Sequence, residues 1–104
     1  MNFYLLPTIE FGPRVIRRLL RQLPPDRMDH ALHPDRFTPR EVAAHVADWE
    51  PIMRDRIRIA LAHPGSEIPA YDEGQMAIDH RYGELDPWEQ AELFVRERRA
   101  TAEL

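Results

Sequence analysis

Residues 38–61 read TPREVAAHVADWEPIMRDRIRIAL, and this stretch decides the fold. Thr38 is a good N-cap, Pro39 suits the first helical position, and Glu41 completes a capping box three residues after Thr38. These signals agree, so the sequence predicts a helix that begins at this point. The breaker run at residues 63–66, His-Pro-Gly-Ser, predicts where the helix ends.

Apolar residues recur along this helix at about 100° per residue, which predicts one face that packs into a core. The predicted face holds Val42, Val46, Trp49, Met53, Ile57 and Ala60. His45 lies at the edge of this face, one turn before Trp49. Pro51 removes one helical hydrogen bond, so we expect a kink between Ala47 and Pro51 rather than a break into two helices.

Three further helices are expected. After a lead-in over residues 1–12, Gly12-Pro13 opens a helix over residues 13–23, and a short helix lies in the 72–82 connection. Asp86-Pro87 repeats the helix-start signal and predicts a last helix that runs to the C-terminus. Since no strand pattern occurs, the predicted fold class is all-α, a helical bundle with up-down packing.

Length and composition limit the classes of function. The chain has 104 residues, enough for one small domain, and it contains no cysteine. Disulfide frameworks, thiol catalysis and thiolate metal sites are therefore excluded. The net charge of −4 argues against nucleic acid as a partner. Without a membrane-spanning run or a secretory signal, we expect a cytoplasmic protein with no membrane partner.

Arginine supplies all fourteen basic residues, and two arginine patterns stand out. Arg98 falls within the apolar row of the last helix, Ala91, Phe94, Val95, Arg98 and Ala102. A buried guanidinium needs a carboxylate, so we expect a partner among Asp48, Glu50 and Asp72, with Asp48 favoured. The alternative is that Arg98 reaches water at the edge of the face. The arginine row of the first helix, Arg14, Arg17, Arg18 and Arg21, indicates a solvated face or, less simply, an anion-binding strip.

His45 is the candidate functional residue. A metal site needs several imidazoles or carboxylates that converge on one point, and neither HxxxH nor HExxH occurs in the chain. On spacing alone, His45 is more typical of a hydrogen-bonded core histidine than of a metal ligand. The carboxylates near it, Asp48 and Glu50, are more typical of salt bridges than of an acid–base pair. No phosphate-binding loop or nucleophile elbow is present.

The segment FTPREVAAHVADWEPIMRDRIRIAL, residues 37–61, resembles the second helix of the DinB-like (DinB/YfiT) superfamily, through its "ft-x-rEv" entry and "aHxaDwE" centre. Residues 13–23, 69–73 and 94–98 extend the resemblance over nearly the whole chain. The resemblance implies a metal-dependent four-helix bundle. It also implies that His45 is one ligand of a divalent metal, nickel or zinc, with two histidines of the last family helix as the others.

The chain ends at what matches the third family helix, so we expect a single DinB-like domain, residues 1–104, without the fourth helix. An uncovered apolar groove would then favour a homodimer. Two functions follow as expectations. The first is a metal-binding domain with transferase or hydrolase activity on an unknown small molecule, in which His45 is a ligand and Asp48 orients it or pairs with Arg98. The alternative is a non-catalytic, self-associating helical module.

Overall fold

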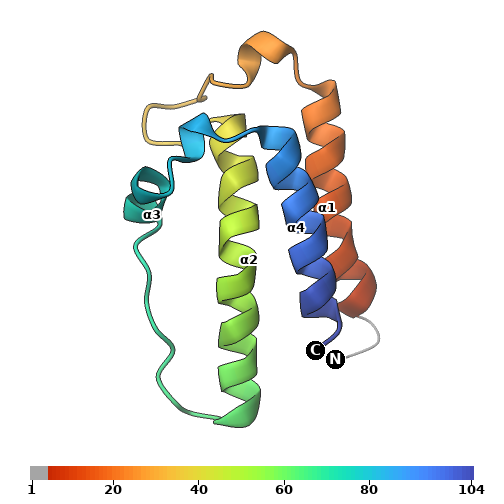
Figure 1. Ribbon diagram of the computed structural model, residues 1–104, viewed down its shortest axis with the longest axis vertical. Coiled ribbons are helices and arrows are strands. Elements are labelled where there is room, and N and C mark those ends of the chain that lie inside the picture. The colour runs from red at the N-terminus through yellow and green to blue at the C-terminus, as the bar shows by residue number, and fades with distance from the viewer. Residues whose placement is uncertain (1–4) are drawn as a thin grey trace.

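The computed structural model describes residues 5–104, and for residues 5–11 it describes the backbone only. Four α-helices and two short 3-10 helices make up this part of the chain, and it contains no strand (Figure 1). The α-helices are α1 (Leu5–Gln22), α2 (Pro39–Ala62), α3 (Glu73–Asp79) and α4 (Pro87–Ala102), and the 3-10 helices are η1 (Pro25–Arg27) and η2 (Tyr82–Glu84). The all-α prediction is confirmed.

The start of α2 follows the predicted capping box. The Thr38 hydroxyl accepts a hydrogen bond from the Glu41 backbone N–H at 3.2 Å, and the Glu41 carboxylate accepts one from the Thr38 N–H at 3.0 Å. Two of the donors that a helix start leaves free are thereby satisfied. The helix continues through Pro51 to Ala62, which confirms the prediction of one helix.

The other two predicted starts are also confirmed. Asp72 caps α3 by accepting from the Gln75 N–H at 3.0 Å. Asp86 caps α4 by accepting from the backbone N–H groups of Trp88 and Glu89. Short polar side chains before a helix satisfy its free donors, and this local chemistry is readable from sequence.

The predicted boundary of the first helix is wrong. The helix begins at Leu5 rather than at Pro13, and Pro13 lies inside it. Gly12 is explained by a close approach instead of a helix start, because a Cβ there would lie 3.3 Å from Arg98 Nη1 and 3.6 Å from the Phe94 ring. Glycine therefore lets α1 come close to α4. Residues 1–4 of the predicted lead-in lie outside the described residues.

Helix α4 packs against both α1 and α2, and Figure 1 shows it between them. Its buried residues include Ala91, Phe94 and Val95, as predicted. On α2 the predicted core face is wrong in part, because Val42 is 37% exposed and Met53 is 43% exposed. The buried side chains of α2 are instead mostly small: Ala43, Ala44, Ala47, Trp49 and Glu50. Small side chains permit close packing of two helices. The alanine face of α2 therefore packs into the core, and the face with Val42 and Met53 stays at the surface.

An ion pair fixes α2 against α4. Arg98 Nε donates to Glu50 Oε1 at 2.7 Å, and Glu50 is buried. The Arg98 guanidinium also lies 4.8 Å from the centre of the Phe94 ring. A carboxylate partner for Arg98 was expected, but the favoured residue, Asp48, is wrong. Two residues along a helix turn the side chain by about 200°, so Asp48 points away from the face that carries Glu50.

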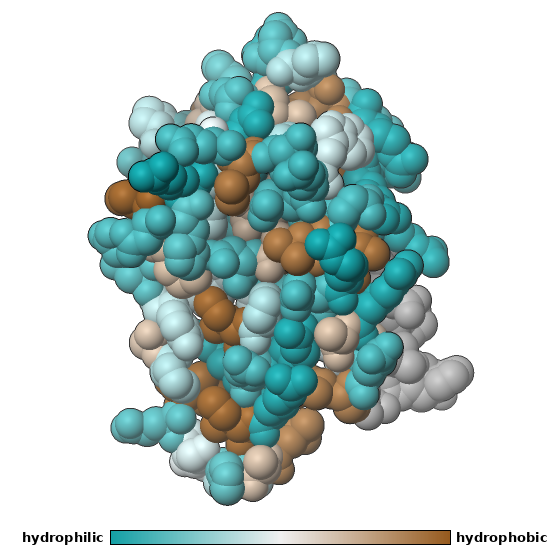
Figure 2. Space-filling model, in the orientation of Figure 1, coloured by the Kyte–Doolittle hydropathy of each residue, from teal (hydrophilic) through white to brown (hydrophobic). Residues whose placement is uncertain are grey.

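Exposed apolar side chains interrupt the hydrophilic surface, and several brown patches are visible in Figure 2. The large apolar side chains that are exposed are Leu19, Leu32, Val42, Met53, Leu61, Ile68, Tyr71, Ile78 and Trp88.

The arginine row on α1 lies mostly in solvent. Arg17 pairs with Glu92 at 2.7 Å, whereas Arg14, Arg18 and Arg21 are exposed. No helix among residues 5–104 is long and apolar enough to cross a membrane.

The Glu50–Arg98 pair gives a prediction about stability. We expect Glu50→Gln to lower the free energy of unfolding by about 2–3 kcal/mol, because it removes the charge of a buried carboxylate from its ion pair with Arg98. Asp55→Asn is the control, since Asp55 forms an exposed pair with Arg58 at 3.1 Å and should cost at most about 0.5 kcal/mol. Urea denaturation measures both changes. Equal losses in the two variants would contradict the role given to the buried pair.

Candidate functional site

Asp48 is the centre of a polar cluster on the side of α2 that faces away from α4. One of its carboxylate oxygens, Oδ2, lies 2.6 Å from His80 Nδ1 and also accepts a hydrogen bond from the Tyr82 hydroxyl at 2.6 Å. A carboxylate can only accept, so Nδ1 of His80 carries the proton. The two partners follow α3 in the chain and hold the α3–η2 segment on α2.

An unusual backbone conformation brings both partners to the same carboxylate. Arg81, between His80 and Tyr82, has φ 54° and ψ 50°, in the left-handed region. Among the described residues it is the only non-glycine residue with a positive φ. That conformation costs a residue with a Cβ about 1–2 kcal/mol. Strain of this kind persists where surrounding contacts hold it in place, and such positions are frequent at functional sites.

Electrostatics favour one protonation pattern in this cluster. The hydrogen bond to Asp48, and then the charge of that carboxylate, raise the pKa of His80 above its usual value. Burial, followed by the hydrogen bond to Asp48, raises the pKa of Tyr82, which keeps its hydroxyl protonated as a donor. The His80 side chain is half-exposed, so its Nε2 edge can meet solvent or a substrate. The arrangement therefore holds an oriented imidazole with one nitrogen available for proton transfer.

His45 lies among aromatic rings instead of on Asp48. Its ring centre is 5.3 Å from Phe37, 5.7 Å from Trp49 and 6.4 Å from Tyr82. Its Nδ1 atom is buried and has no hydrogen-bond partner among the described residues. The residue is thus packed, as one alternative expected, but the hydrogen bond that usually satisfies a core histidine is missing. Asp48 makes its hydrogen bonds to His80 and Tyr82, so it does not orient His45 as expected.

An arginine of α2, Arg56, lies against two aromatic rings that contact each other, Trp49 and Tyr71. The Arg56 guanidinium lies 5.4 Å from the Trp49 ring centre and 5.5 Å from that of Tyr71. Arg56 also donates to the Pro69 carbonyl oxygen at 3.0 Å. These cation–π contacts and the hydrogen bond fasten the long connection between α2 and α3 to α2.

The described residues do not fit a complete metal site. No three of their histidine, aspartate or glutamate side chains are grouped so that they could hold an ion. The unsatisfied Nδ1 of His45 is the one feature that suits a ligand, and Asp48 and His80 are bound to each other. The role of His45 as a metal ligand stays a prediction. Glu50 and Arg98, which the sequence analysis also singled out, form the ion pair between α2 and α4.

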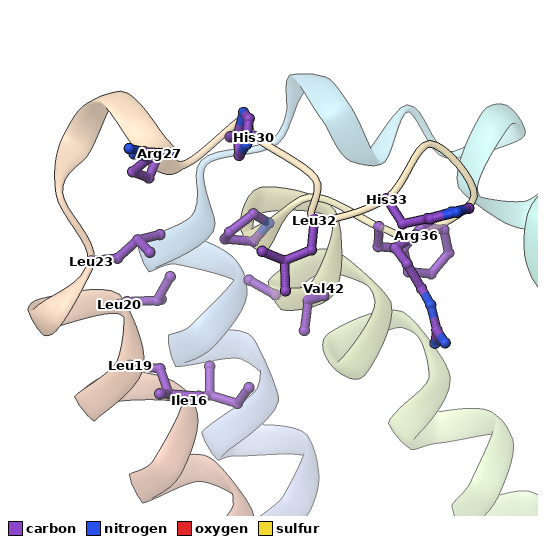
Figure 3. A pocket seen from close by; sticks show the side chains of 13 residues that line it. Ile16, Leu19, Leu20, Leu23, Arg27, His30, Leu32, His33, Arg36 and Val42 are labelled. Atoms are coloured by element: carbon purple, nitrogen blue, oxygen red, sulfur yellow. The ribbon is translucent and has the colours of Figure 1, made fainter.

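A hollow of about 730 Å³ is a second candidate site (Figure 3). It lies between α1 and the first turns of α2, and the segment before α2 crosses above it. Most of its lining is apolar, and His45 and Asp48 do not contribute to it.

Sequence reasoning identified Asp48 but missed His80 and Tyr82 as its partners. They lie 32 and 34 residues from Asp48 in the chain, so no local pattern joins them. The one signal was the length of the connection between the second and last helices, since long connections in small domains are often functional.

Comparison with known proteins identifies the family. A model of the DinB superfamily matches residues 8–104, and the chain belongs to this superfamily. The resemblance found in the sequence is therefore confirmed, and the helical bundle agrees with it. No curated protein and no solved structure is detectably similar to the chain.

The cluster gives a prediction about pH. We expect Asp48→Asn to lower the pKa of His80, because the variant removes the hydrogen-bonded anion that raises it. NMR titration of the His80 ring measures this change. Asp55→Asn is the control, because it removes an exposed carboxylate outside the cluster, and it should leave the His80 titration unchanged. An unchanged His80 titration in Asp48→Asn would contradict the assigned hydrogen bond.

The Asp48–His80 pair makes the stability of the fold depend on pH. A raised pKa in the folded state means that protonated His80 stabilises the fold at pH values below its unfolded pKa, about 6.5. This contribution is lost as the pH rises through the folded pKa. The difference in unfolding free energy between the wild type and Asp48→Asn should therefore be larger at about pH 5 than at about pH 9.

Proposed function

We propose that this member of the DinB superfamily uses the Asp48–His80 pair as the proton-transfer site of a hydrolase or transferase. The observation that carries the proposal is the double hydrogen bond to a single carboxylate oxygen, from His80 Nδ1 and the Tyr82 hydroxyl. Tyr82 is buried and holds the carboxylate in place, while the His80 side chain is half-exposed. A fixed carboxylate behind an accessible imidazole is the arrangement of an acid–base catalyst.

The chemistry follows from the tautomer. With the proton on Nδ1, the Nε2 lone pair of neutral His80 accepts a proton from water or from the hydroxyl or thiol of an acceptor substrate. The freed nucleophile attacks an acyl carbon and forms a new bond to it. Asp48 stabilises the imidazolium that results, and the imidazolium returns its proton to the leaving group when the original ester bond breaks. The proton that His80 takes from the nucleophile goes to the leaving group, so the Asp48–His80 pair returns to its starting charge.

Metal binding at His45 is a separate part of the proposal. His45 would contribute one ligand to a divalent ion, nickel or zinc, and the missing partner of its Nδ1 atom supports this. Since the described residues offer no group of three ligands, the remaining ligands would come from outside them, for example from a second copy of the chain.

A self-associating helical module without catalysis is the second candidate. It is supported by the exposed apolar side chains on α2, Val42 and Met53, which belong to the apolar row recognised in the sequence. Apolar side chains on one helix face are typical of surfaces that bind a partner. In this reading the Asp48 cluster only fastens α3 to α2.

The first candidate is tested with a simple activated ester. The wild type should accelerate the hydrolysis of 4-nitrophenyl acetate, and His80→Gln should lose most of that acceleration, roughly tenfold or more, because the proton acceptor is gone. Asp48→Asn should retain an intermediate rate. The measurement is the absorbance of released 4-nitrophenolate as a function of pH.

His63→Gln is the matched control, since His63 is an exposed histidine at the end of α2 and lies outside the cluster. It should keep the rate of the wild type. If His80→Gln hydrolyses the ester as fast as the wild type, or if both variants lose the same fraction, the acid–base assignment is wrong.

The second candidate and the metal are tested together. Light scattering at high micromolar concentration should give twice the monomer mass if the chain self-associates, and Val42→Glu should restore the monomer by placing charge on the apolar row. Elemental analysis of the same sample should find nickel or zinc at one per chain or one per dimer, lost in His45→Ala. A metal-free monomer would contradict both the module and the ligand role of His45.

A further inference from the structure

The hollow between α1 and the first turns of α2 has the size and walls of a small-molecule site. Its volume of about 730 Å³ lies within the range of roughly 300–1,000 Å³ that ligand pockets occupy. Helix α1 supplies one wall through Ile16, Leu19, Leu20 and Leu23, and Val42 lies on the opposite wall (Figure 3). Leu19 is 56% exposed and Leu32, which hangs into the space from above, is 98% exposed. These side chains would lose water contact if a ligand entered.

The polar part of the lining is entirely basic or imidazole. It consists of Arg27, His30, His33 and Arg36, and the lining residues include no carboxylate. Figure 3 places Arg27 and His30 at the upper rim, above the leucines of α1, while Arg36 extends away from α1. His33 Nδ1 lies 3.7 Å from Asp35 Oδ2. Arg27 forms no ion pair among the described residues. A positive rim above an apolar wall selects a ligand with an anionic head and an apolar body.

We propose that this cavity binds a free carboxylic acid with an alkyl tail. Its carboxylate lies at the rim beside Arg27, where a charge-assisted hydrogen bond can form. Its tail runs down the wall from Leu23 toward Ile16, a distance of about 10 Å along the helix. A tail of this length corresponds to a medium-chain acid, and we take octanoate as the probe.

Charge favours such an acid over a second copy of the chain at this cavity. A two-fold interface brings the same patch of both copies together. Two sets of Arg27 and Arg36 would then meet in a lining that offers no carboxylate to pair with them. A free acid also fits better than a membrane lipid, because the hollow has room for one small molecule.

Calorimetry and NMR with octanoate test the proposal. Octanoate should bind once per chain and shift the backbone amide signals of the lining residues. Butyrate, which has four fewer methylenes to bury, should bind roughly tenfold or more weakly. Octylammonium has a cationic head and an alkyl tail one methylene longer than that of octanoate, and it should still bind at least tenfold more weakly than octanoate, because it meets the positive rim.

Matched variants separate the contribution of the ligand's charged head to binding from that of its alkyl tail. Arg27→Gln should weaken octanoate binding about tenfold and strengthen octylammonium binding, because it removes a positive charge from the rim, whereas Arg14→Gln, an exposed arginine of α1 outside the lining, should change neither. Val42→Glu should abolish octanoate binding by adding an anion to the wall. Leu61→Glu, at an exposed position near the end of α2 outside the lining, should have no effect.

Three results would overturn the proposal. Equal binding of octanoate and octylammonium would show an apolar surface without selection for an anion. Equal losses in Arg27→Gln and Arg14→Gln would show attraction to general positive charge. A dimer that dissociates in Val42→Glu, together with no octanoate binding, would make the second copy the occupant of the cavity.

Discussion

The ion pair between Glu50 and Arg98 sets the rotation of α2 about its own axis, and the other features of the structure depend on that rotation. Glu50 must face α4 to meet Arg98 at 2.7 Å. Ala43 and Ala47 share this face at helical spacing and are buried with it. Asp48, two residues before Glu50, then points to the opposite side, where His80 and Tyr82 reach it. Val42 and Met53 remain at the surface as a consequence.

Much of the fold was readable from local chemistry. The capping residues Thr38, Asp72 and Asp86 fix the starts of three helices through hydrogen bonds to their own backbone, so sequence alone locates them. The start of α1 was missed, because Gly12 serves a contact with α4 that depends on tertiary structure. The inward face of α2 was misjudged for the same reason. Hydrophobicity favoured valine and methionine, but close helix packing selects alanine, and a buried ion pair settles the orientation.

The candidate site was predictable only in its separate parts. His45 and Asp48 stand out in the segment that resembles the DinB family, and family membership is confirmed over residues 8–104. The pairing of Asp48 with His80 and Tyr82 requires the chain to return to α2 after more than thirty residues, and it requires a left-handed residue at Arg81. Neither the return nor that conformation leaves a pattern in the sequence, since arginine is not a residue that favours positive φ.

The tautomer of neutral His80 is the decisive property to measure, because proton transfer at this site depends on a proton held on Nδ1 by Asp48. Long-range ¹H–¹⁵N NMR of the neutral ring, recorded above its pKa, distinguishes the two nitrogens. We expect a protonated Nδ1 and an unprotonated Nε2, with the pattern lost in Asp48→Asn. A proton on Nε2 in the wild type would leave no acceptor at the exposed edge, and it would contradict the assignment of His80 as the base.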